Sequence, residues 1–121
     1  MASSTIKKGR NLLWTNPNGS LAENAEITLS SSQYNYLLIE FRLTWQDPII
    51  TNIVPKGSNI RLFLAQATSD GVLSNCLIAS RNLVRTSDTK FTAELGYLAR
   101  LTGQIVSGTN FIYPTAIYGI D

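Results

Sequence analysis

The chain has 121 residues, 44% of them apolar, which is the size and composition of one globular domain with a modest core. No apolar run approaches the ~20 residues that a membrane-spanning helix needs, so no membrane insertion is expected. The formal net charge is +2, and Lys7, Lys8 and Arg10 place three positive charges in the first ten residues. From Asn11 onward, seven basic residues face eight acidic ones, so no basic surface for nucleic acid is expected.

Residues 1–10 (MASSTIKKGR) are polar, and no apolar stretch of the kind found in secretory signals follows their basic residues. We expect a mobile basic arm or linker over residues 1–10, or the cut end of a longer protein. Residues 11–121 are then expected to form one β domain.

Apolar and polar side chains alternate in several segments, with the period of two that is typical of half-buried strands. The clearest case is residues 37–45, where Leu37, Ile39, Phe41, Leu43 and Trp45 share one face. Further strands are expected at residues 11–15, 26–29, 49–54, 59–66, 75–85, 90–95 and 110–120.

The segments between these strands are rich in turn-forming residues, and Asp70-Gly71 is the best candidate for a tight hairpin. Residues 95–101 are expected to be a loop or a single helical turn, because Leu95, Leu98 and Leu101 come nearest to a helical spacing but do not form a convincing stripe. Many short strands with frequent turns predict an all-β domain, either an antiparallel β-sandwich or a jelly-roll-like fold.

The last expected strand is apolar on both faces, which is unusual for a domain of this size. Either it is a central strand between two layers, or one face meets another copy of the chain. The second alternative predicts an oligomer interface at Ile112, Tyr113, Ile117, Tyr118 and Ile120.

The sequence offers little catalytic chemistry and no expected cofactor. It has no histidine and one cysteine, Cys76, which lies in an apolar stretch and is expected to be buried and inert. A structural zinc site and most hydrolase triads are therefore excluded.

Carboxylates are the remaining candidates for catalysis or metal binding. Glu40 and Glu94 lie on expected strands, and as cross-strand neighbours they would be a candidate glycosidase pair. Asp47, Asp70 and Asp88 lie in expected loops, but they do not form a calcium-binding motif. We therefore expect a protein without enzymatic activity, and a small glycan-cleaving enzyme is the least favoured alternative.

Aromatic residues supply a binding alternative. Trp14 and Trp45 are expected to anchor the core, but Trp45 also ends a strand beside a turn, where binding residues often lie. Tyr97 follows Gly96 and is expected to be exposed in a loop. Trp45 and Tyr97 are therefore the candidate ligand-binding residues of a carbohydrate-binding module.

Four motifs together resemble a family of phage virion domains, the C-terminal parts of tail fibres, head fibres and minor structural proteins. They are residues 12–18 (LLWTNPN), 34–41 (YNYLLIEF), 80–84 (SRNLV) and 112–120 (IYPTAIYGI). Ala116 and Tyr113 depart from the family pattern near the end, so no ligand site is transferred.

The resemblance implies a β-sandwich tip that projects from a virion, assembled as a homotrimer and in contact with other virion proteins. Its expected role is structural, or attachment to the host surface, where a cell-surface glycan is a possible partner. A trimer would bury the spare face of the last strand and would fit the low content of charged residues, 15%.

Overall fold

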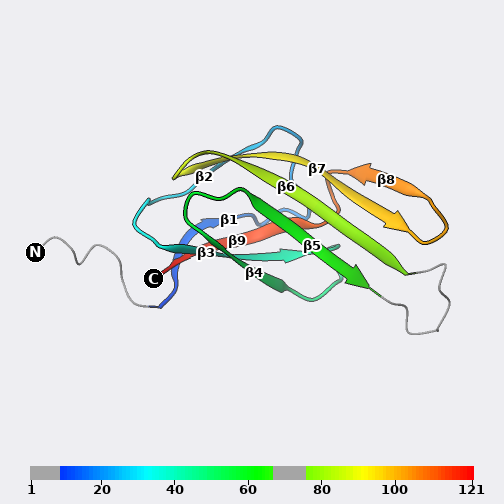
Figure 1. Ribbon diagram of the computed structural model, residues 1–121, viewed down its shortest axis with the longest axis horizontal. Coiled ribbons are helices and arrows are strands. Elements are labelled where there is room, and N and C mark those ends of the chain that lie inside the picture. Colours follow the sequence, from blue (N-terminus) through cyan, green and yellow to red (C-terminus); the bar gives the residue numbers. More distant parts are fainter. Residues whose placement is uncertain (1–8, 67–75) are drawn as a thin grey trace, which may run out of the picture.

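The computed structural model describes residues 9–66 and 76–121, and these form nine strands and no helix (Figure 1). No helix in this part of the chain is long and apolar enough to cross a membrane. The strands are β1 (Asn11–Thr15), β2 (Glu26–Thr28), β3 (Tyr36–Arg42), β4 (Ile50–Pro55), β5 (Ile60–Gln66), β6 (Leu77–Ser87), β7 (Lys90–Arg100), β8 (Ile105–Gly108) and β9 (Tyr113–Ile120).

The strands form two antiparallel sheets that pack face to face, which confirms the expected β-sandwich (Figure 1). The first sheet has the order β1-β9-β3-β4, so β9 is a central strand between β1 and β3. The second sheet has the order β2-β7-β6-β5. β2 pairs with the N-terminal part of β7, and β8 pairs with the C-terminal part of β7 along the same edge. β5, β6 and β7 are consecutive antiparallel neighbours in this sheet.

The core lies between the sheets and follows the alternation of the sequence. Leu37, Ile39, Phe41 and Leu43 are all buried, as the pattern predicts. They face apolar residues of the second sheet such as Leu62. Each such side chain contributes about 1.5–3 kcal/mol by leaving water, and this burial holds the two sheets together.

Two expectations about strands were wrong. Residues 95–100 continue β7, and β8 was missed because its turn-forming Ser107 and Gly108 suggested a loop. Gly96 is the physical reason for the first error, since a glycine inside a strand weakens the pattern. A Cβ at Gly96 would lie 2.5 Å from the carbonyl oxygen of Phe111, so the close approach of that backbone requires a glycine. The Asp70-Gly71 turn lies outside the described residues.

The position of β9 explains most of its apolar character. Ile112 and Ile117 are fully buried in the chain's own core, and Tyr113 is 2% exposed. These three residues therefore have no surface to offer a second copy, which corrects their assignment to an oligomer interface. Tyr118 and Ile120 are half-exposed on the outer face of the first sheet, and only they remain candidates.

Tyr34 closes the sandwich at the end where β6 turns into β7. Its ring is buried and its hydroxyl donates a hydrogen bond of 2.5 Å to the carbonyl of Asp88. Burial raises the pKa of Tyr34, and the neighbouring Asp88 charge adds to that shift. A hydrogen bond from Arg85 lowers the pKa of Asp88, so this turn carries a tight ion pair at 2.6 Å.

Arg81 is a buried cation inside the sandwich. It is 1% exposed, and its burial lowers the pKa of the guanidinium. No carboxylate of the described residues pairs with it. Instead it donates hydrogen bonds to three backbone carbonyls, those of Glu94 at 2.6 Å, Thr109 at 3.2 Å and Leu21.

The three carbonyls belong to β7, to the β8–β9 loop and to the β1–β2 loop. The amide of Leu21 also donates to the carbonyl of Thr109 at 2.8 Å, so the two loops are bonded to each other as well as to Arg81. Leaving a buried charge or a carbonyl without a partner costs free energy, so the guanidinium and the loops depend on one another.

We expect Arg81→Met to lower the free energy of unfolding by about 3 kcal/mol or more, because each of the three carbonyls loses its charged donor. Urea unfolding followed by tryptophan fluorescence measures the change. The control is Arg61→Met, since Arg61 is exposed on β5 and, among residues 9–66 and 76–121, donates a hydrogen bond to the Asn82 side chain at 2.9 Å. That control should cost less than about 1 kcal/mol, and equal losses in the two variants would contradict the role assigned to Arg81.

Candidate functional site

The acidic residues do not assemble into a site. The described residues contain no cluster of three or more histidine, cysteine, aspartate or glutamate side chains able to hold a metal. Glu40 lies on β3 in the first sheet and Glu94 on β7 in the second, so the expectation that they are cross-strand neighbours was wrong. Glu40 instead pairs with Arg10 at 3.2 Å.

The candidate loop ligands are also engaged elsewhere. Asp47 accepts hydrogen bonds from the amide and hydroxyl of Thr44, and Asp88 pairs with Arg85. Asp70 lies outside the described residues. Cys76 is half-buried just before β6, which is less buried than the sequence suggested.

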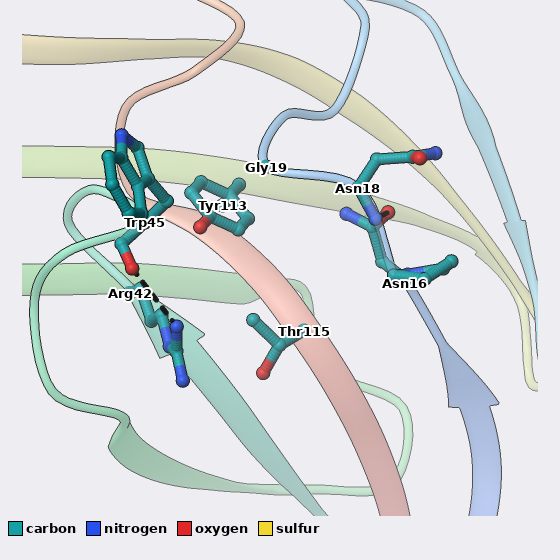
Figure 2. A pocket seen from close by; sticks show the side chains of 8 residues that line it. Asn16, Asn18, Gly19, Arg42, Trp45, Tyr113 and Thr115 are labelled. Carbon is teal, nitrogen blue, oxygen red and sulfur yellow. Dashed lines mark hydrogen bonds between the residues drawn. The ribbon is translucent and has the colours of Figure 1, made fainter.

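The larger of two concave sites is a pocket of about 350 Å³ in the first sheet, where β1 and β3 end and β9 begins (Figure 2). Its volume lies at the lower end of the range for small-molecule sites. A second cavity of about 160 Å³ near the start of β4 is smaller, and most of its lining residues are apolar. The larger pocket is lined by Asn16, Pro17, Asn18, Gly19, Arg42, Trp45, Tyr113 and Thr115.

Figure 2 shows two walls with β9 between them. Arg42 and Trp45 form one wall, at the end of β3 and in the turn that follows. Asn16 to Gly19 form the other, in the loop after β1. Tyr113 and Thr115 project from β9 in the middle. The pocket therefore combines three segments that are far apart in the sequence.

Asn16 holds the loop wall in place. Its side-chain amide donates to the carbonyls of Ser20 at 3.0 Å and Pro114 at 3.1 Å, and its Oδ1 accepts from the amide of Asn18 at 3.1 Å. The last bond is an Asx turn, the local structure that Asn side chains favour. The buried Asn16 thus ties the loop to β9 and leaves the Asn18 side chain exposed.

Trp45 lies on a rigid turn at the opposite wall. The amide of Asp47 donates to the carbonyl of Thr44 at 3.0 Å, and the Asp47 carboxylate returns bonds to Thr44. Arg42 Nη1 donates to the carbonyl of Trp45 at 3.1 Å. The backbone on both sides of Trp45 is therefore fixed, while its side chain remains 69% exposed. The expectation that Trp45 anchors the core was wrong, whereas Trp14 does pack against the core.

The backbone at the start of β9 is strained. Ile112 has a φ of 43°, in the left-handed region that β-branched residues rarely adopt. Such a conformation costs about 1–3 kcal/mol and persists only where the surroundings impose it. Here the fully buried side chain and an amide bond of 2.8 Å to the carbonyl of Leu43 impose it. This kink directs the next residue, Tyr113, to the pocket.

Arg42 supplies the only charge among the residues that line the pocket. Within the described residues its side chain makes one hydrogen bond, to Trp45, and no ion pair. Its Nε is buried without an acceptor. The pocket thus has a cationic corner beside an exposed indole.

The two candidate binding residues lie apart. Trp45 lines the pocket, but Tyr97 does not; it lies on β7 rather than in a loop and is 50% exposed on the outer face of the second sheet. Arg42, Asn18 and Thr115 were missed. The Asn16–Ser20 turn was a usable signal for Asn18, but nothing in the sequence indicated that β9 passes between that turn and Arg42.

Comparisons of this chain with protein-family models, curated proteins and solved structures found no match.

We expect Asn16→Asp to lower the free energy of unfolding by about 2–3 kcal/mol, because a carboxylate oxygen would replace a donor that faces two carbonyls. The control is Asn18→Asp, which adds the same charge two residues away at an exposed position. It should change the free energy of unfolding by less than about 0.5 kcal/mol. Urea unfolding of the two variants tests this. Equal stabilities would show that Asn16 does not hold the loop.

Proposed function

We propose that this chain is a non-enzymatic attachment module that binds a saccharide in the pocket between β9, the β1–β2 loop and the turn after β3. The observation that carries the proposal is the exposed Trp45 indole on a fixed turn, beside a cavity with several polar groups. An aromatic side chain that stays in water on a rigid backbone loses little entropy when a ligand covers it.

The pocket chemistry suits a sugar. A pyranose ring presents an apolar C–H face that packs on an aromatic ring, and its hydroxyls need both donors and acceptors. Trp45 offers the aromatic face and the Asn18 amide offers both donors and an acceptor. The Thr115 hydroxyl, which donates to the carbonyl of Glu40 at 3.1 Å, offers an acceptor. The lining includes no carboxylate, which supports binding rather than glycan cleavage as the role of this pocket.

The virion setting is the second part of the proposal. The resemblance of four motifs to phage fibre and minor structural domains supports a place on the particle, with other virion proteins as neighbours. A pocket-bearing sandwich in that setting would contact a bacterial surface saccharide. A free carbohydrate-binding module remains the alternative, and finding the chain in purified particles by mass spectrometry would separate the two.

We expect Trp45→Ala to weaken saccharide binding by about tenfold or more, because the indole loses the apolar area that the sugar covers. Binding to an array of bacterial oligosaccharides, followed by calorimetry on the best ligand, measures this. Tyr97→Ala is the matched control, since Tyr97 is a similarly exposed aromatic residue outside the pocket.

A ligand that binds the wild type and both variants equally would place its site elsewhere. Loss of binding in Tyr97→Ala alone would move the site to the outer face of the second sheet. Absence of any saccharide ligand would reject the proposed function.

We also propose that the chain forms a homotrimer through the outer face of the first sheet. There, Leu12, Tyr118, Leu38 and Ile53 lie in direct register across β1, β9, β3 and β4. This apolar row includes Leu12 and Ile53, which are more than half exposed. Arg10 lies over the Tyr118 ring at 4.1 Å and pairs with Glu40, so its charge would not repel a second copy.

We expect Ile53→Lys to shift the chain from trimer to monomer, because each copy would bury a lysine in an apolar contact. Light scattering coupled to size-exclusion chromatography at micromolar concentration measures the mass. Phe63→Lys is the control, because Phe63 is equally exposed but lies on β5 of the other sheet. A wild-type protein that is already a monomer at that concentration would reject this interface.

A further inference from the structure

Arg42 is one of several described cations without a carboxylate partner, and it is the one that lines the pocket. Arg10 pairs with Glu40, Arg85 with Asp88 and Lys90 with Glu26, whereas Arg42 pairs with no carboxylate. Arg85 Nε also lacks an acceptor, but its terminal nitrogen has the Asp88 carboxylate at 2.6 Å. Arg42 has five N–H donors and a single hydrogen bond to a neutral carbonyl.

The nearby acids do not compensate this charge. Glu40, two residues earlier on β3, is bound by Arg10, and Asp47 forms no ion pair with Arg42 and does not line the pocket. The other pocket residues are neutral. The field inside the cavity is therefore positive at the Arg42 corner, and a half-buried cation without a counterion favours an anionic ligand group.

The geometry also restricts how a ligand would lie. The carbonyl of Trp45 accepts from Arg42 Nη1, so the guanidinium is fixed to the same turn that presents the indole. A ligand whose ring packs on Trp45 has its substituents within the same cavity as Arg42. A planar guanidinium binds carboxylates and phosphates better than it binds hydroxyls, because it donates two parallel hydrogen bonds to two oxygens.

We propose that the saccharide bound here is anionic, with its sugar ring on Trp45 and its oxyanion on Arg42. This inference rests on the proposed saccharide-binding function and adds the charge of the ligand. A uronate carboxylate and a sugar phosphate share the required chemistry. Asn18, on the opposite wall, and Thr115, on β9 between the walls, would contact the neutral hydroxyls.

The test pairs ligand charge with Arg42. We use an oligosaccharide array that holds matched pairs. Each uronate is paired with its carboxyl-reduced counterpart, and each sugar phosphate with its dephosphorylated counterpart. The array is probed with the wild type, Arg42→Gln and Arg61→Gln. We expect the wild type to prefer the anionic member of a pair by about 10- to 100-fold. Arg42→Gln should abolish that preference, and Arg61→Gln, which alters an exposed arginine of the second sheet, should retain it.

Two readouts separate a charge contact from a merely structural role of Arg42. If Arg42 only positions the Trp45 turn, Arg42→Gln weakens binding of the anionic and neutral members equally, and the inference fails. If Arg42 holds the oxyanion, binding of the neutral member is unchanged, and added salt weakens anionic binding to the wild type more than to the variant.

The failures of the two proposals are distinguishable. A wild type that binds neutral and anionic members equally rejects the anionic ligand and leaves saccharide binding intact. A wild type that binds no member of the array rejects both. Preference for uronates over phosphates, or the reverse, identifies the source of the oxyanion, because the two groups are on separate members of the array.

Discussion

A single buried guanidinium connects the parts of this sandwich that strand pairing leaves apart. Hydrophobic burial brings the two sheets together, but it is non-directional and does not specify where long connecting loops lie. Arg81 supplies that direction, because its donors reach β7, the β1–β2 loop and the β8–β9 loop at the same time. The arrangement has no ion pair, so its strength depends on carbonyl dipoles that the folded backbone must hold in place.

The candidate site depends on this arrangement. The β1–β2 loop leads from the pocket wall at Asn16–Gly19 to Leu21, and the β8–β9 loop leads from Thr109 to Tyr113. Both loops are therefore fixed a few residues from the cavity, on the side that faces the core. Asn16 and the strained Ile112 then set the final positions of the wall and of Tyr113. A preorganised pocket of this kind spends little free energy on ordering its own residues when a ligand binds.

The sequence predicted the layers of the fold because period-two alternation reflects burial on one side of a strand. The sequence-based prediction failed where the alternation of a segment does not match the burial of its residues. The apolar pattern of residues 37–43 continued to Trp45, but the strand ends at Arg42 and the Asp47 turn directs the indole outward. Gly96 broke a pattern that the backbone continues, because Phe111 needs the space of a missing side chain. Arg42 looked like an ordinary polar-face residue, and only the path of β9 brings it opposite Asn18.

The hydrogen bond from Asn16 to Pro114 joins residues 98 positions apart, and it closes the wall of the pocket. A contact of such long sequence separation closes a loop of most of the chain, which has a high cost in conformational entropy. The pocket wall therefore forms only when the two ends of the described β domain have paired, and a molecule without that pairing lacks the pocket. A ligand that binds in this pocket would stabilise the pairing of β1 with β9 by mass action. Only correctly folded chains would then hold the ligand.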